Sequence, residues 1–225
     1  MAINLYTGTP GSGKSLHLAD KIYHALLMKR HCIVNFPVSI PKNLKHREKY
    51  LHYIDNSELT VDYLVKFSFD LMKKTGKYIP EDSILCIIDE CQIMFNCREW
   101  GKSDRAEWLK FFTQHRKFGY HIILVAQFDG MVDKQLRSLI EYQFIHRKVS
   151  NFGWRGILLC ALMLSPRLFV AVQVWYPMKE TVGSEFFKFH RRYASMYDTH
   201  SLFDIFEEKE DNIDNPLTLI ESEVS

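Results

Sequence analysis

Short apolar runs alternate along the chain with longer stretches in which apolar residues recur at helical spacing. The apolar runs predict strands at Ile3 to Tyr6, Cys32 to Asn35, Leu51 to Ile54, Ile84 to Ile88, Ile122 to Ala126 and around Tyr142 to His146. The amphipathic stretches predict helices over Ser15 to Lys29, Val61 to Lys74 and Asp104 to Phe118, with a shorter helix beyond Asp133. Strands that alternate with helices predict the α/β class, with a mainly parallel central sheet flanked by helices.

A longer apolar stretch, from Gly156 to Tyr176, raises the question of a membrane span. Arg167 lies near its middle, and a charge at the centre of a bilayer costs about 3 kcal/mol. Each half of the stretch is too short to span a membrane alone. We therefore predict no stable membrane span but a C-terminal β-hairpin extension, with strands Ile157 to Met163 and Leu168 to Trp175.

The length of 225 residues fits one domain with an appendage. We expect residues 1–195 to form that domain, including the hairpin at 156–176, and residues 196–225 to form a flexible or partner-bound tail. From Glu207 onward the tail carries seven acidic residues against the single Lys209 and has few large apolar groups, so it has little to bury.

Charge and cysteine content bear on the partners of the protein and on its cellular compartment. The net charge of +2 gives no bulk indication of a nucleic-acid or membrane partner, so any basic surface must be local. Two basic stretches, His146 to Lys148 and Lys188 to Arg192, interleave with aromatic residues, and they either bind phosphates and bases or cover the core. The five cysteines form no CxxC pair and Met1 leads directly into a strand, which favours reduced thiols in a cytoplasmic protein.

The loop after the first strand carries a phosphate-binding motif. Residues 8–15, Gly-Thr-Pro-Gly-Ser-Gly-Lys-Ser, match the P-loop pattern GxxxxGK[ST] between a predicted strand and a predicted helix. The glycines let backbone N–H groups turn inward around phosphate oxygens, Lys14 would reach the β and γ phosphates, and the Ser15 hydroxyl would ligate Mg²⁺. We expect bound ATP to be surrounded by Gly8, Thr9, Pro10, Gly11, Ser12, Gly13, Lys14, Ser15 and Leu16.

Two acids follow the strand Ile84 to Ile88. In an open parallel sheet ligands bind at the carboxyl ends of the strands, so Asp89 and Glu90 should lie beside the P-loop. Asp89 is then expected to support Mg²⁺ and Glu90 to act as the general base toward water. The alternative is a solvated Asp-Glu pair with no role. Two acids at this place favour hydrolysis over simple binding.

Two further polar residues are candidates for the reaction. Gln127 ends the strand Ile122 to Ala126, where it could sense the γ phosphate. Arg116, late in the preceding helix, is the first candidate for the cation that stabilises the transferred phosphoryl group, in cis or in trans, with Arg137 and Arg147 behind it. An arginine at a helix end also has a simpler explanation as a partner of the helix dipole or of a carboxylate.

Several segments together resemble the zonular occludens toxin (Zot) domain: Ile87 to Glu90, Gln114 to Gln127, and Leu139 to Tyr142 followed by His146 to Lys148. The resemblance spans Met1 to Lys148 and continues toward Tyr193. The resemblance implies a core similar to that of FtsK/HerA-type motor ATPases. The family includes the assembly proteins of filamentous phages, which act at the inner membrane during virion extrusion. The resemblance also implies that Lys14, Ser15, Asp89 and Glu90 are the ATPase residues, with Gln127 as sensor.

From these patterns we expect a Mg²⁺-dependent ATPase motor subunit for phage assembly and export. We expect a homo-oligomer, with a ring as one arrangement, and a cargo of single-stranded DNA or a phage DNA-protein complex. Many family members continue into a transmembrane helix; here we expect peripheral docking on a separate membrane-embedded partner at the inner face of the membrane. The alternatives are a translocase of naked DNA, a nucleotide-gated scaffold with little turnover, and a small-molecule kinase whose lid would be the short segment Arg98 to Arg105.

Overall fold

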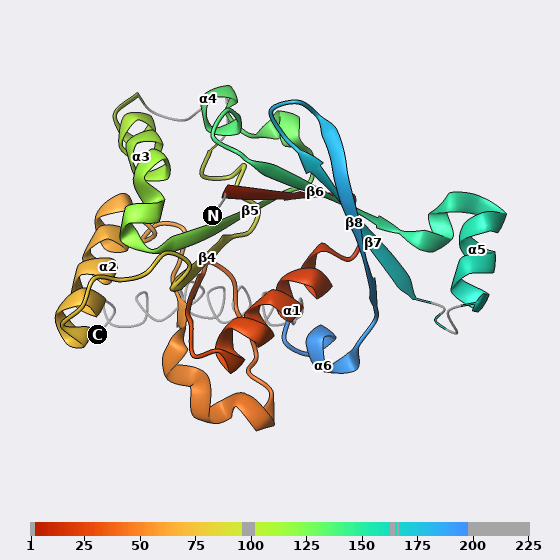
Figure 1. The fold of residues 1–225 in the computed structure, drawn as a ribbon, viewed down its shortest axis with the longest axis horizontal. Helices are drawn as coiled ribbons and strands as arrows, with labels where there is room; N and C mark the ends of the chain where they lie inside the picture. Colours follow the sequence, from red (N-terminus) through yellow and green to blue (C-terminus); the bar gives the residue numbers. More distant parts are fainter. Residues whose placement is uncertain (1–2, 96–101, 163–164, 166, 198–225) are drawn as a thin grey trace, which may run out of the picture.

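The computed structural model describes residues 3–95, 102–162, 165 and 167–197. It contains an eight-stranded sheet in the order β3-β2-β4-β5-β1-β6-β7-β8 (Figure 1). The strands are β1 Ile3–Thr7, β2 His31–Val34, β3 Leu51–Tyr53, β4 Ile84–Ile88, β5 Tyr120–Ala126, β6 Tyr142–Lys148, β7 Leu168–Trp175 and β8 Glu180–Lys188. The six neighbouring strands β3, β2, β4, β5, β1 and β6 pair in parallel. The predicted α/β architecture is therefore confirmed.

Helices cover both faces of the sheet. The α-helices are α1 Lys14–Leu27, α2 Val61–Thr75, α3 Lys102–Gln114, α4 Lys134–Arg137, α5 Gly153–Leu162 and α6 Arg191–Ala194, and short 3-10 segments are η1 Lys42–Tyr50, η2 His115–Phe118, η3 Asp129–Met131 and η4 Val149–Phe152. Figure 1 shows α2 and α3 side by side, and α6 beside α1.

The core consists of two apolar layers, one on each face of the parallel strands. Leu5, Ile88 and Leu124 belong to the layer under α2 and α3, whereas their neighbours Tyr6 and Val125 belong to the layer under α1. Successive side chains of a strand point to opposite faces, so runs without polar positions fill both layers. This burial fixes the register of the strands, so their carboxyl ends lie together along one side of the sheet.

Local signals set the ends of α2. The Thr60 side chain accepts a hydrogen bond from the backbone N–H of Tyr63 at 3.2 Å, which satisfies a free donor of the first turn. Gly76 ends the helix in the left-handed conformation, with φ of 65°. The prediction of this helix from its apolar spacing and its terminal glycine is therefore confirmed.

The C-terminal hairpin exists, but one of its predicted strands is wrong. Residues 157–162 belong to the helix α5, and the antiparallel pair of β7 is β8 on one side and β6 on the other. A continuous apolar run does not distinguish a buried strand from a helix by its periodicity. Since β6 and β8 satisfy both edges of β7, the preceding run has no strand partner and satisfies its backbone as a helix.

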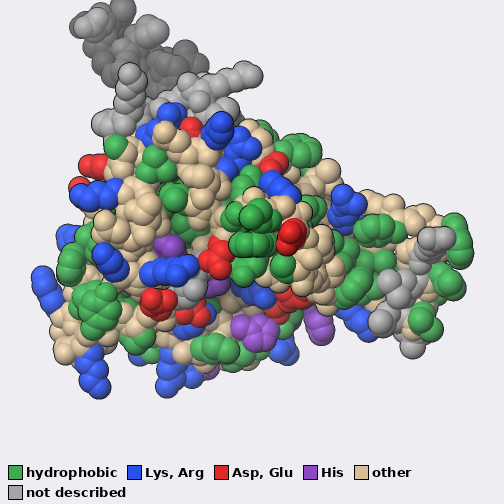
Figure 2. Space-filling view, turned by 45° about the horizontal axis from the view of Figure 1, so that its top comes forward, with side chains coloured by type: hydrophobic (Ala, Val, Ile, Leu, Met, Phe, Trp, Pro, Cys, Tyr) green, Lys and Arg blue, Asp and Glu red, His purple; other side chains and the backbone are tan. Residues whose placement is uncertain are grey.

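The α5 helix and the chain end also bear on the predicted boundaries. In Figure 2, hydrophobic side chains cover much of the arm that extends to the right, where α5 lies. Trp154, Leu158 and Leu162 are 70%, 61% and 77% exposed. Within the described ranges, no helix has the length and apolar character needed to cross a membrane. The predicted tail lies outside the described residues except for Met196 and Tyr197, and Met196 is fully buried, so the packed chain extends past residue 195.

Candidate functional site

The P-loop forms a tight turn between β1 and α1. The Ser12 N–H donates to the Thr9 carbonyl at 3.1 Å, and the Lys14 ammonium donates to the carbonyl of Gly8 and, at 3.4 Å, to that of Thr9. Gly13 has φ of 98°, and a Cβ there would lie 2.7 Å from the Phe169 ring. Gly13 is therefore required both by its conformation and by the close approach of β7. The loop is arranged to present backbone N–H groups to an anion.

The two acids lie beside this loop, at the carboxyl end of β4. The Asp89 N–H donates to Asn35 Oδ1 at 2.7 Å, and Asn35 Nδ2 donates to the Asp89 carbonyl at 2.9 Å, so β2 holds this strand end in place. Glu90 adopts a left-handed φ of 45°, and its N–H donates to Asp89 Oδ1 at 2.8 Å. A left-handed glutamate is unusual and is found mainly where the surroundings require it.

Burial and charge act against each other at the site. Burial raises the pKa of Asp89, and hydrogen bonds from Tyr197 and from the Glu90 N–H and the charge of Lys14 oppose that shift. Burial lowers the pKa of Lys14, and the charges of Asp89 and Glu90 oppose that shift. Carboxylate and hydroxyl oxygens are the ligands that Mg²⁺ prefers, and a buried carboxylate gains from a nearby cation. Asp89 and Ser15 therefore fit a magnesium site.

One pocket of about 440 Å³ brings the predicted residues together. P-loop residues from Pro10 to Leu16 line it with Asp89, Glu90 and Gln127. Its remaining wall comes from the C-terminal third of the chain, through Phe169, Phe189, Ala194 and Tyr197. The sequence analysis missed these wall residues.

The comparisons with known proteins identify the family of this chain. A sequence profile described as zonular occludens toxin (Zot) matches residues 2–194. This chain belongs to the Zot family. The Gene 1 protein of Escherichia phage If1 is 28% identical over 156 residues, which are 67% of this chain and 43% of that protein. The Gene 1 protein of Enterobacteria phage fd is 25% identical over 146 residues, 65% of this chain and 42% of that protein.

This Zot-family chain thus spans about two fifths of the length of the curated relatives it matches. The N-terminal domain of zonular occludens toxin from Neisseria meningitidis has the same fold, with a TM-score of 0.54 and 18% identity over 88% of this chain and 98% of that domain. The predicted resemblance to the Zot domain is confirmed.

The Zot-family motif around Arg116 does not reach the nucleotide pocket of its own chain. Arg116 lies in η2 before β5, at the amino ends of the parallel strands, and its guanidinium pairs with Glu141 at 3.1 Å. The length of β5, roughly 20 Å, separates this end from the P-loop. The structure does not bring Arg116 to this pocket, and its role stays a prediction that its place directs to a neighbouring subunit. Gln127, by contrast, ends β5 beside the loop, and the Gly8 N–H donates to its carbonyl at 3.2 Å.

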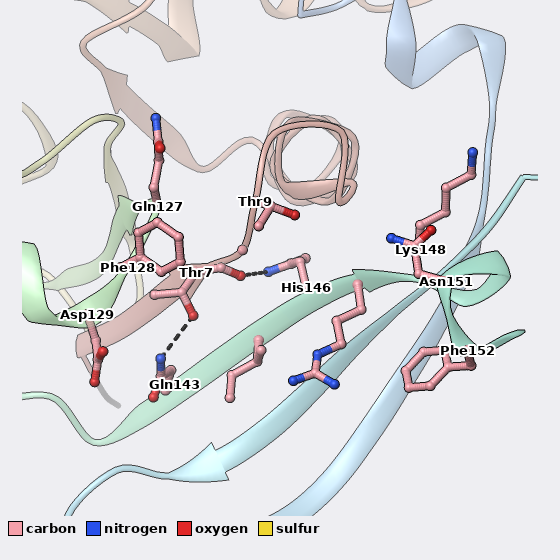
Figure 3. Close-up of a pocket in the computed structure, with 13 residues that line it drawn as sticks. Thr7, Thr9, Gln127, Phe128, Asp129, Gln143, His146, Lys148, Asn151 and Phe152 are labelled. Carbon is pink, nitrogen blue, oxygen red and sulfur yellow. Dashed lines mark hydrogen bonds between the residues drawn. The ribbon is translucent and has the colours of Figure 1, made fainter.

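A second pocket, of about 480 Å³, lies on the other side of the P-loop (Figure 3). It shares Gln127 with the nucleotide pocket, and Gly8 and Thr9 line it too. Arg147 and Lys148 line it, and neither has an ion-pair partner within the described residues. The rings of Phe128 and Phe152 also line it and are about half exposed. Of the two basic stretches noted in the sequence, the first therefore borders a pocket next to the site.

A buried histidine pair joins α1 to β6 beside the second pocket, which His146 lines. His146 Nδ1 donates to the carbonyls of Phe144 at 3.0 Å and Thr7 at 3.2 Å, which leaves its Nε2 to accept from His17 Nδ1 at 2.9 Å. Figure 3 shows His146 and Thr7 joined in this way. His17 follows Lys14 by one helical turn, so the pair fastens α1 and the P-loop to β6.

Proposed function

We propose that this chain is a Mg²⁺-dependent ATPase subunit that drives the assembly and export of a filamentous phage. The observation that carries the proposal is the single pocket in which Lys14, Ser15, Asp89, Glu90 and Gln127 meet. Membership in the Zot family and phage relatives support the biological setting.

Each residue has a role that follows from its place. Lys14 binds the β and γ phosphates, and the P-loop N–H groups orient them. Ser15 and Asp89 hold Mg²⁺, which neutralises charge on the phosphates when it is bound. Glu90 accepts a proton from the attacking water, and Gln127 orients that water or the γ phosphate.

The proposed motor function requires more than one copy of the chain. Arg116 and Glu141 lie at the ends of the strands opposite to the nucleotide, so Arg116 could complete only the site of a neighbouring subunit. The subunits would form a homo-oligomer in the cytoplasm, docked on a membrane-embedded partner. The cargo would be single-stranded DNA or its protein complex.

The first experiment measures ATP hydrolysis by the purified chain against its own concentration. Lys14→Ala is expected to lower turnover by on the order of 10²- to 10³-fold, and Glu90→Gln by a similar factor, because each removes a group that acts on the transition state. Lys21→Ala, on the same helix but paired with Glu185 at 3.5 Å, is the control and should keep the rate. A rate that rises faster than linearly with protein supports a site completed between subunits.

The same assay separates the rival functions. The basic and aromatic lining of the second pocket favours direct contact with DNA, so a translocase of naked DNA predicts stimulation by DNA alone. Lys14-dependent ATP binding with no turnover, at any concentration and with or without DNA, would leave a nucleotide-gated scaffold as the function.

A further inference from the structure

The last residues that the structure describes fold back over the nucleotide pocket. Residues 191–197, called the strap below, comprise α6 and the three residues after it. Met196 is fully buried in the core layer under α1, and its carbonyl accepts a hydrogen bond from the Ser39 N–H at 2.9 Å. The Arg192 guanidinium donates to the Tyr23 hydroxyl at 3.1 Å. The strap is therefore fastened to α1 and to the loop after β2.

The end of the strap reaches the two side chains that fit a magnesium site. The Tyr197 hydroxyl donates a hydrogen bond to Asp89 Oδ2, in the pocket that Ser15 also lines. The Tyr197 ring packs against Phe36, with 4.9 Å between ring centroids, and the fixed ring aims the hydroxyl. One hydroxyl thus occupies an oxygen of the carboxylate that is expected to support Mg²⁺.

We propose that Tyr197 is a placeholder in the metal site. Its hydroxyl holds Asp89 Oδ2, in the pocket that Ser15 also lines, while the pocket holds no nucleotide, and Tyr197 leaves when Mg²⁺ and nucleotide bind. The inference rests on the proposed function, because it assumes that the same two side chains hold the ion.

The physical reason is competition for the same oxygens. Mg²⁺ requires ligands at about 2.0–2.1 Å in a near-octahedral arrangement, so the Asp89 lone pair that now accepts from the phenol must turn to the ion. Until then the phenol satisfies Oδ2 of a buried carboxylate whose Oδ1 already accepts from the Glu90 N–H. Because Met196 and Tyr197 are adjacent, departure of the phenol also loosens the strap at Ser39. Nucleotide binding and strap position are therefore coupled.

The first test compares the affinity of wild type, Tyr197→Phe and Tyr193→Phe for a fluorescent, slowly hydrolysed ATP analogue. With Mg²⁺ present, Tyr197→Phe is expected to bind about tenfold more tightly, the factor that corresponds to one hydrogen bond to a charged group. With EDTA in place of Mg²⁺ the gain should shrink. Tyr193 belongs to the same strap, and its ring packs on that of Tyr23 with 5.4 Å between centroids. Tyr193→Phe removes only a hydroxyl and should bind the analogue like wild type.

The second test follows the strap itself by hydrogen exchange. In wild type, Mg²⁺ and the analogue together should speed exchange of the Ser39 amide and of strap amides, whereas the analogue with EDTA should not. The proposal is overturned if Tyr197→Phe binds with unchanged or weaker affinity, or if the strap keeps its protection with Mg²⁺ and nucleotide bound. Weaker binding would place the phenol in the bound state instead.

A control separates this inference from the function on which it rests. If Lys14→Ala abolishes binding of the analogue while Tyr197→Phe leaves it unchanged, the nucleotide site stands and the placeholder alone fails. If wild type binds no analogue with Mg²⁺, both fail.

Discussion

The two halves of the sheet differ in what covers them and in what their ends carry. Strands β2, β4, β5 and β1 are parallel and buried on both faces, and their carboxyl ends carry the P-loop, Asp89 and Gln127. Strands β7 and β8 are antiparallel, β8 is largely exposed, and α5 carries an apolar ridge into solvent. The parallel half therefore supplies most of the buried core and the predicted site residues, while the antiparallel half supplies one wall of the pocket and exposed surface.

The sharpest way to test this comparison is to truncate one leucine in each half. Leu124 on β5 is fully buried, so Leu124→Ala should lower the free energy of unfolding by about 3 kcal/mol through lost transfer energy and a cavity. Leu158 on α5 is 61% exposed, so Leu158→Ala should change it by less than about 0.5 kcal/mol. Urea unfolding followed by circular dichroism measures both. Equal losses of unfolding free energy in the two variants would contradict the view that the parallel half supplies most of the stability.

Acid should lower the stability of the protein through His146, on β6, where the two halves of the sheet join. Burial, and after it the charge of His17, lowers the pKa of His146 from 6.5 to about 3. The unfolded chain therefore binds a proton on this residue near pH 6.5 and the folded chain only near pH 3. Since the unfolded state binds more protons in this window, the free energy of unfolding should fall as the pH drops from about 6.5, by about 1 kcal/mol per pH unit.

The contributions of other groups, among them His31 on β2 and Glu185 beside His17, have to be separated from that of His146. Burial also lowers the pKa of His31 to about 4, so part of the slope is expected to come from that residue. Contact with His17, whose Nε2 lies 3.5 Å from Glu185 Oε2, lowers the pKa of Glu185 to about 2, so folded Glu185 stays ionised above pH 5 and adds little to the slope there. Urea unfolding of wild type and His146→Gln at pH 7, 6 and 5 should show a flatter dependence for the variant; parallel curves would assign the acid response elsewhere.

The smallest expected effect concerns the second pocket, on the antiparallel side. Arg147→Gln with Lys148→Gln should weaken binding of single-stranded DNA and reduce the slope of log affinity against log salt by about 1 to 2, since two phosphate contacts are lost. Fluorescence anisotropy over a salt series gives the slope. Arg191→Gln with Arg192→Gln, in the second basic stretch, is the matched control, and equal losses in both pairs would show that general charge and not this pocket binds DNA.

The sequence alone predicted most of the parallel half. A strand, a glycine-rich loop and a helix in succession give a P-loop because local conformation is what the motif requires, and Gly13 at φ of 98° shows why glycine is needed. The run from Ile84 to Ile88 predicted a central strand because every position is apolar. Asn35 could have been found by the same reasoning, since it follows β2 and β2 is the neighbour of β4.

The tertiary structure decided what depends on partners distant in the chain. Residues 157–162 are a helix because β7 already has two strand neighbours, which no local pattern records. Arg116 is near Glu141 and far from the P-loop because parallel strands separate their two ends by their full length. Tyr197 meets Asp89 only because the chain returns across α1 after eight strands. Local sequence therefore determined the groups that would act on a nucleotide, and long-range packing determined which other groups stand beside them.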